Sequence, residues 1–286
     1  MEVETGFASL HVLDAALDTL RGVNVHSLDV TECELAAVPE ALAGMESMTS
    51  LTLCSNKIKS GWEQLRSLRQ LRVLDLRDCN LTELPEALAG MESVTSLKLE
   101  GNPIKSGWER LRPLRQLQEL DLSQFGLTEV PAALAGMESV TSLNLSWNRI
   151  NRGWERLRSL HQLRELHLRG CDLAVLPEAL AGMENVTSLV LSVNRIERGW
   201  EHLCPLHQLG ELGLSHCNLT ELPEALAGME SLTRLDLSYN PIKRGWERLR
   251  SLRKLRELGL QGSILERCEL TEVSAAVAHL ESLTSP

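Results

Sequence analysis

Leucines recur along the chain at a fixed spacing and alternate with polar residues. In the stretch that starts at Leu71, apolar side chains return at Leu74 and Leu76. The Leu-x-Leu step has a period of two, which predicts a short strand with inward-facing leucines. Residues 85–91 follow, with proline at a place tolerated in a first helical turn and then good helix formers. The pattern predicts one strand and one or two turns of helix per repeat.

This element recurs with a period of 46 residues. The segment VPEALAGMES at residues 38–47 returns as LPEALAGMES, VPAALAGMES, LPEALAGMEN and LPEALAGMES at residues 84–93, 130–139, 176–185 and 222–231. A Gly-Trp-Glu triplet recurs with the same period, at Trp62, Trp108, Trp154, Trp200 and Trp246. Each period divides into a Leu-Pro half and a Gly-Trp half of 23 residues, which predicts about eleven strands.

Both halves fit the frame LxxLxLxx(N/C)xL, and on this frame the chain resembles the leucine-rich-repeat family from about Val25 to Leu283. The LPxxL halves are similar to Ras-group intracellular leucine-rich repeats, whereas the GWExL halves depart at the Leu-Pro pair. The resemblance implies an α/β leucine-rich-repeat solenoid of horseshoe shape. Its parallel concave sheet would have about 11 strands, with short helices or turns on the convex side.

The two ends of the chain differ from the repeats, and solenoids need caps over their exposed core edges. Residues 1–24 are expected to form a helical cap, because Phe7 to Leu20 have helical apolar spacing. The solenoid would then span residues 25–262. Residues 263–286 are expected to be a divergent cap or a truncated repeat, because Cys268 to Val273 match the start of a Leu-Pro half after a shift of five residues.

Two sets of repeated residues are expected to be structural. One set ends the strand frame, with asparagine in one half, cysteine in the other and Phe125 once. Its members are Asn56, Asn102, Asn148, Asn194 and Asn240, with Cys33, Cys79, Cys171 and Cys217. The resemblance implies that the asparagines form a ladder of bonds to the backbone. The second set is the five Gly-Trp tryptophans, whose near-identical contexts favour packing on the convex side over a binding platform.

The copies differ mainly at the solvent-facing strand positions, which are therefore the candidate binding surface. One row crosses five neighbouring strands at the position before the Asn or Cys: Trp147, Gly170, Val193, His216 and Tyr239. Tryptophan and tyrosine are frequent anchors of protein interfaces. Five further residues would supply polar contacts beside this row: Asp121, Asn144, His167, Arg169 and Asp236. The alternative is that the exposed aromatic residues are neutral.

The N-terminal part of the predicted concave face is acidic. Its carboxylates are Asp29, Glu32, Asp75, Asp78, Glu100 and Asp121. Such a stripe would steer basic partners, or it would simply be a solvated face that keeps the protein soluble.

Charge and composition narrow the possible functions. A net charge of −10 argues against a protein that binds the phosphate backbone, so no nucleic-acid partner is expected. No apolar run approaches a membrane span, and the acidic N-terminus does not look like a signal peptide. Seven cysteines without zinc-type spacing predict reduced thiols and no metal site. These features favour a cytoplasmic location, although a secreted protein that has lost its signal peptide would fit as well.

No catalytic motif, metal or cofactor site is evident, so the chain is not expected to be an enzyme. We expect a monomeric recognition module that binds an unidentified protein on its concave face, as immune-type receptors and intracellular signalling scaffolds do. The alternative is an architectural or engineered solenoid without a dedicated partner. The irregular substitutions on the strands favour the first interpretation.

Overall fold

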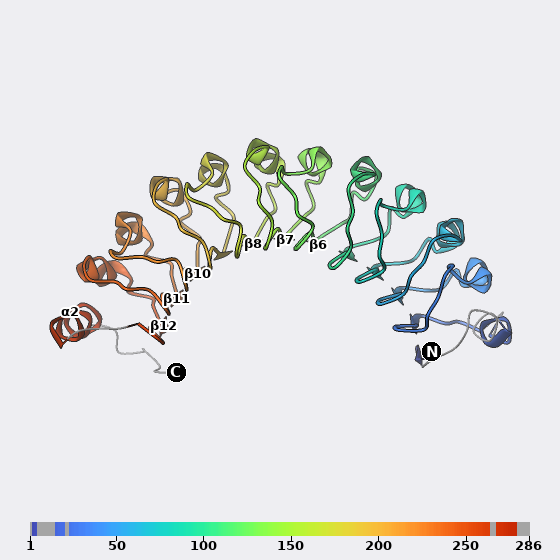
Figure 1. Cartoon of the computed structure of the whole chain (residues 1–286), viewed down its shortest axis with the longest axis horizontal. Coiled ribbons are helices and arrows are strands. Elements are labelled where there is room, and N and C mark those ends of the chain that lie inside the picture. Colours follow the sequence, from blue (N-terminus) through green and yellow to red (C-terminus); the bar gives the residue numbers. More distant parts are fainter. Residues whose placement is uncertain (1, 5–14, 21–22, 264–266, 279–286) are drawn as a thin grey trace. The chain divides into compact units, whose positions relative to one another are not determined.

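The computed structural model describes residues 2–4, 15–20, 23–263 and 267–278. The chain forms two compact units. The first contains Met1–Gly126 and Pro131–Leu143, and the second contains Leu127–Val130 and Asn144–Pro286. Within either unit, strands form the inner wall and short helices form the outer wall (Figure 1). We call these the strand face and the helix wall.

The first unit contains parallel strands that pair in sequence order. They are β1 (Glu2–Glu4), β2 (Ser27–Asp29), β3 (Ser50–Thr52), β4 (Val73–Asp75), β5 (Ser96–Lys98) and β6 (Glu119–Asp121). The central leucines lie in register, as Leu51 does with Leu74. The helix wall consists of 3-10 helices: η1 (Glu40–Gly44), η2 (Trp62–Ser67), η3 (Glu86–Gly90), η4 (Trp108–Leu111) and η5 (Ala132–Gly136). β7 (Ser142–Asn144) lies at the boundary of the two units.

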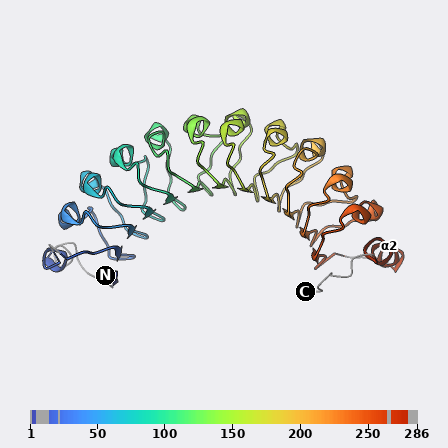
Figure 2. The same ribbon diagram turned by 180° about the vertical axis from the view of Figure 1, so that it is seen from behind.

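The second unit repeats this arrangement, as the view from behind also shows (Figure 2). Its parallel strands are β8 (Glu165–His167), β9 (Ser188–Val190), β10 (Glu211–Gly213), β11 (Arg234–Asp236) and β12 (Glu257–Gly259). Its 3-10 helices are η6 (Trp154–Ser159), η7 (Glu178–Gly182), η8 (Trp200–Leu203), η9 (Glu224–Gly228) and η10 (Trp246–Ser251). The α-helix α2 (Arg267–Val277) packs against η10.

The predicted leucine-rich-repeat solenoid is confirmed, with strands β2 to β12 at the eleven Leu-x-Leu positions. The sequence did not predict β1, which pairs with β2. The Leu-Pro helices start after a proline and run for five residues, too few for a stable α-helix on their own. They therefore adopt the tighter 3-10 form.

The interior consists of leucine layers from the two walls. Strand leucines such as Leu166 and Leu189 are fully buried, and so are helix leucines such as Leu157 and Leu180. Phe125, at the one position where a cysteine is replaced, lies edge-on to Trp108 with 5.8 Å between ring centroids. Apart from this pair, aliphatic side chains fill most of the interior, which explains how a chain with few aromatic residues can form a core.

The two ends follow the expectations only in part. Residues 15–18 of the expected N-terminal cap are helical, whereas residues 5–14 and 21–22 lie outside the described part. At the other end, Cys268 to Val273 belong to the α-helix α2, whereas the equivalent residues 79–84 form an irregular turn after β4. Ser-Ala-Ala-Val at residues 274–277 stands where the repeats have Pro-Glu-Ala-Leu, so the proline that precedes each Leu-Pro 3-10 helix is absent, and α2 packs against η10.

Candidate functional site

The asparagines at the strand ends form buried backbone contacts, as expected for structural residues. Asn194 is 2% exposed. Its Oδ1 accepts hydrogen bonds from the backbone N–H of Cys171 and Leu173, both at 3.0 Å. Its Nδ2 donates to the backbone oxygens of Leu168 and Leu191 at 2.8 and 2.7 Å. One amide thus satisfies polar groups of two successive repeats, which would otherwise be buried without partners.

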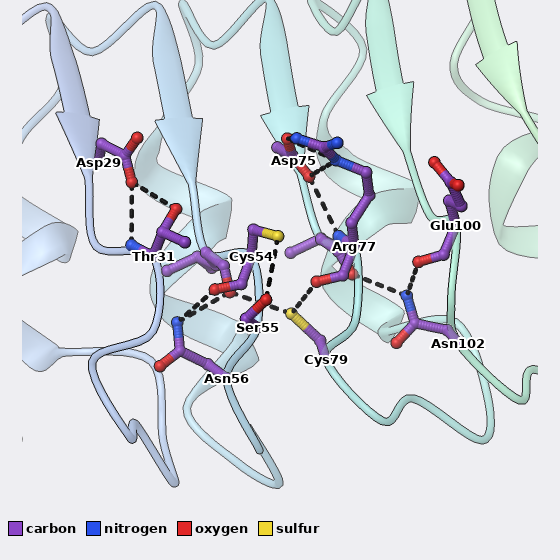
Figure 3. Close-up of polar contacts among 12 residues, drawn as sticks. Asp29, Thr31, Cys54, Ser55, Asn56, Asp75, Arg77, Cys79, Glu100 and Asn102 are labelled. Carbon is purple, nitrogen blue, oxygen red and sulfur yellow. Dashed lines mark hydrogen bonds and ion pairs between the residues drawn. The ribbon is translucent and has the colours of Figure 1, made fainter.

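The cysteines supply part of the same contact in the Leu-Pro halves. The Cys79 thiol donates to the Leu53 oxygen at 3.1 Å, and the Asn102 amide donates to the equivalent Leu76 oxygen at 2.7 Å (Figure 3). Burial raises the pKa of the Cys79 thiol to about 12 and that of Cys171 to about 11. These thiols therefore stay protonated near neutral pH and act as structural donors.

The five repeated tryptophans belong to the helix wall. Each one starts a 3-10 helix after a glycine with a left-handed backbone, as Trp200 does after Gly199. Trp62, Trp108, Trp154 and Trp200 are half-buried. Trp246 is 1% exposed, in the helix η10 against which α2 packs. The packing interpretation fits this arrangement better than a binding platform does.

The candidate row lies at the end of the strands, where the backbone is left-handed. The residue just before the strand-end Asn, Cys or Phe125, together with Gly262 in the last half-repeat, forms a column of eleven equivalent positions, one per half-repeat. The row is the part of this column from Trp147 to Tyr239. All eleven residues of this column have φ between 53° and 73°. The second unit contributes Trp147 (59°), Val193 (61°), His216 (54°) and Tyr239 (58°). A left-handed conformation costs an L-residue roughly 1–2 kcal/mol, and a β-branched residue such as valine is a clear outlier there. The backbone thus holds large side chains at positions that suit glycine or asparagine better.

Trp147 occupies space that Gly170, the next member of the row, leaves open. A Cβ atom at Gly170 would lie 2.5 Å from Cε3 of the Trp147 ring. The Arg169 guanidinium lies 5.8 Å from the centre of that ring, in a cation–π arrangement. The Trp147 side chain is nevertheless 48% exposed. Trp147 and Arg169 therefore form an exposed pair at one end of the row.

His216 and Tyr239 form the other end of the row. Their rings stack with centroids 4.3 Å apart and an interplanar angle of 9°. A Cβ atom at Gly262 would overlap the Tyr239 ring, so this glycine leaves room for tyrosine as Gly170 does for tryptophan. Tyr239 is 51% exposed. The half-exposed Val193 lies between the two ends of the row.

A hollow adjoins the stacked pair on the side of the loops that follow the strands. Its lining comes from the turns after β9, β10 and β11. The lining residues are Arg195, Ile196, Glu197, His216, Cys217, Asn218 and Tyr239. The row therefore continues into a recess with polar walls and the buried Ile196 at its base.

The predicted polar residues have mixed roles. The Oδ1 atoms of Asn144 and Asp236 accept hydrogen bonds from the backbone N–H two residues ahead, both at 3.0 Å, and so help to end their strands. Asp121 makes the same contact at 2.8 Å, but it belongs to the first unit. His167 is half-exposed in β8. The structure thus brings together the predicted residues of the second unit on one strand face, and gives two of them a structural task as well.

The acidic stripe of the first unit is partly neutralised within the chain. Asp75 is 4% exposed, and its carboxylate accepts hydrogen bonds from Nε and Nη2 of the Arg77 guanidinium, with a shortest N···O distance of 2.7 Å (Figure 3). The hydrogen bond to Asp75 raises the pKa of Arg77. Asp75 therefore cannot be counted as a free charge that attracts a basic partner.

Sequence reasoning predicted Arg169 beside the row but missed the roles of the two glycines and of Arg149 and Arg195. Gly170 and Gly262 matter because each leaves room for the ring of the preceding repeat. The signal was present as an aromatic residue followed 23 positions later by glycine. Within the described residues, no group of three His, Cys, Asp or Glu side chains is placed to hold a metal ion. The helices among those residues are all too short or too polar to cross a bilayer.

Known proteins share this architecture. Two family models described as leucine-rich repeat match the chain, one at residues 46–104 and 207–265 and the other at residues 136–151. No curated protein sequence matches it.

Solved structures resemble the fold over almost the whole chain. A Listeria monocytogenes internalin has a TM-score of 0.74 and 23% identity, covering 91% of this chain and 74% of the internalin. A Leptospira interrogans leucine-rich-repeat protein has a TM-score of 0.66 and 18% identity, covering 98% and 89%. Toll, in a Drosophila Toll–Spatzle complex, has a TM-score of 0.76 and 19% identity, covering 99% of this chain but 39% of Toll.

At these identities the likeness concerns the fold alone. The 23-residue strand–helix repeat, the asparagine contacts at the strand ends and the family-model matches agree with one another. The chain belongs to the leucine-rich-repeat family.

Proposed function

We propose that the strand face of the second unit binds another protein, with the contact centred on the row from Trp147 to Tyr239. The observation that carries this proposal is the presence of two large, half-exposed aromatic side chains on left-handed backbone. The chain has only six tryptophans, two phenylalanines and one tyrosine. Placing the single tyrosine and the one non-repeat tryptophan there favours a binding role.

The surroundings of the two aromatics also fit a protein interface. Tryptophan, tyrosine and arginine are the residues most enriched at interface hot spots, and Trp147, Tyr239 and Arg169 lie on this one face. Parallel strands on a repeated scaffold hold them in fixed order, so binding requires little reorganisation. Toll, which shares the fold, was solved as a complex with Spatzle. A recognition role of the immune-receptor or signalling-scaffold kind is consistent with this proposal, and so is a cytoplasmic location.

The test is a quantitative pull-down from lysate of the native host with three versions of the full chain. They are the wild type, the double variant Trp147→Ala/Tyr239→Ala, and Val175→Ala, which removes an exposed apolar side chain that is 44% exposed outside the row. We expect one or more proteins captured by the wild type and by Val175→Ala to be lost from the double variant. Circular dichroism confirms that all three are folded. Equal capture by all three would contradict the proposal.

A further inference from the structure

Three arginines next to the row have no acidic partner within the described part of the chain. Arg149 follows Trp147 by two residues, Arg195 follows Val193 by two, and Arg169 lies beside the Trp147 ring. All three are exposed. Their backbone N–H groups are bonded, but no carboxylate lies within ion-pair distance of their guanidinium groups. Positive charge therefore faces solvent beside the aromatic side chains.

Other arginines of the same unit, on the 3-10 helices and in the segments that lead to them, pair with carboxylates. Arg152 pairs with Glu129 at 3.0 Å, and Arg158 pairs with Glu178 at 3.0 Å. The Arg248 guanidinium pairs with Glu221 at 2.8 Å. The lack of partners near the row is thus local and does not reflect a shortage of carboxylates in an acidic protein.

The hollow beside the stacked rings extends this pattern. Arg195 lines it together with His216, Tyr239 and Asn218, all of which carry polar groups that can meet an anion. Glu197 also lines the hollow and offsets the charge of Arg195 there, so the unpaired positive charge of Arg149 and Arg169 lies outside the hollow.

We propose, building on the proposed function, that the partner presents an extended acidic peptide segment that lies along the row. Its carboxylates would pair with Arg169 and Arg195, and an apolar or aromatic side chain would contact Val193 between the two aromatic ends. The row spans four strand spacings, about 19 Å, and an extended chain rises about 3.3 Å per residue. About six residues therefore suffice to reach from Trp147 to Tyr239.

A single-stranded nucleic acid is the rival ligand, because exposed aromatics and arginines also bind bases and phosphates. The strand face speaks against it. Glu165, Glu211 and Glu257 are exposed at the starts of β8, β10 and β12. Arg234 on β11 pairs with Glu211 at 3.4 Å and with Glu257 at 2.7 Å, which leaves three carboxylates against one arginine in this strip. The strip therefore keeps a net negative charge that disfavours a continuous phosphate backbone, whereas an extended peptide can place its few carboxylates at the row itself.

The experiment selects random 12-residue peptides displayed on phage against the immobilised full chain. We expect the selected peptides to be enriched in Asp and Glu together with an aromatic or large aliphatic residue. A synthetic copy of the strongest peptide is then fluorescently labelled, and its binding is measured by anisotropy. Arg169→Glu/Arg195→Glu should weaken binding at least about tenfold, because each attraction becomes a repulsion, and added salt should weaken it further.

A matched control keeps the change in net charge the same. Arg250 and Arg253 are exposed, at and just after the end of η10, and Arg250→Glu/Arg253→Glu should leave peptide binding within about twofold of wild type. If the control weakens binding as much as the row variant does, the proposal is wrong, because the peptide then responds to overall charge.

Other outcomes separate this inference from the proposed function. Selected peptides without acidic enrichment that still need Trp147 and Tyr239 would overturn the acidic segment and leave protein binding at the row intact. Tighter binding of a labelled 12-nucleotide single-stranded RNA than of the peptide, lost in Arg169→Glu/Arg195→Glu, would overturn it in favour of nucleic acid. If no peptide is selected, the peptide inference fails, and the pull-down alone decides whether a protein binds at the row. If Trp147→Ala/Tyr239→Ala does not reduce binding of a selected peptide, both proposals fail.

Discussion

In each half-repeat the residue at the strand end has a left-handed backbone, and several of the side chains found there differ from those that this conformation favours. Asparagine or glycine would suit this column in every repeat. The second unit instead places tryptophan, valine, histidine and tyrosine there. Strained residues persist where the surrounding structure holds them, and they concentrate at functional sites. In the first unit the same column has small or polar residues, such as Ser55 and Asp78.

Val193 allows this strain to be measured. Val193→Asn should stabilise the folded protein by about 0.5–1 kcal/mol, because asparagine tolerates the left-handed region and valine does not. The measurement is urea unfolding followed by circular dichroism. Val190→Asn is the matched control, on strand β9 with ordinary strand geometry and similar exposure, and it should give no gain. A destabilised Val193→Asn variant would mean that the valine contributes more by packing than it costs in backbone strain.

At the scale of the element, each Gly-Trp helix begins where a glycine meets the backbone of the preceding Leu-Pro half. Gly199 has φ of 88°, and a Cβ atom there would lie 2.8 Å from the Leu176 oxygen and 2.9 Å from its nitrogen. Both the conformation and the contact therefore require glycine. The two kinds of half-repeat are complementary at this point, which explains why the period is 46 residues and not 23.

Gly199→Ala should destabilise the protein by about 2–4 kcal/mol, because backbone strain and backbone overlap add together. Gly182→Ala is the control. Gly182 ends η7 with nothing within 4 Å of an added Cβ atom and without positive φ, so this change should be neutral or slightly stabilising. Thermal unfolding of both variants beside wild type measures the difference. Equal melting temperatures for the two variants would show that the Leu176 contact can relax.

The sequence predicted those elements that are determined by residues recurring in every copy of the repeat. The leucines that form β8 and β9, and the buried Asn194, occur in every copy of their half-repeat, and comparison of the copies was enough to find them. Features that depend on one neighbour were missed. In the sequence Gly170 is simply a member of the row without a side chain, whereas in the structure the Trp147 ring fills the space next to its Cα atom. The sequence left a divergent cap and a truncated repeat open for residues 263–286, and the match at Cys268 to Val273 did not predict that these residues form the helix α2.

On the scale of the whole molecule, contacts between elements join neighbours in the repeat order. Within the second unit, η7 packs against η6 and η8, and β10 pairs with β9 and β11. Stability in such a chain is approximately a sum of repeat terms and nearest-neighbour terms. The effect of a deletion on stability therefore depends on whether it still places a Leu-Pro half beside a Gly-Trp half.

Removing residues 165–210, one full period, should leave a folded protein whose melting temperature lies within about 5 °C of wild type. Arg164 would then precede Glu211, and every Leu-Pro half would still meet a Gly-Trp half. Removing residues 165–187 would place two Gly-Trp halves side by side, and Gly199 would lose its contact with Leu176.

This shorter deletion should lower the melting temperature by about 10 °C or more, despite removing fewer residues. Circular dichroism melts compare the two. A half-period deletion as stable as the full-period one would show that the two kinds of half are interchangeable.

The fit between Gly199 and Leu176 has a consequence for how such a gene can change. Near-identical copies invite unequal recombination, and only exchanges that shift the alignment by a whole period preserve every junction between halves. Each 46-residue period gained would add two strands and lengthen the strand face by about 10 Å. It would also add two strand-end residues, which later point mutations can alter without disturbing the leucine interior. The contact between the two kinds of half thus restricts which residues can fill the interior. It still allows the number of repeats and the exposed strand-end side chains to change quickly.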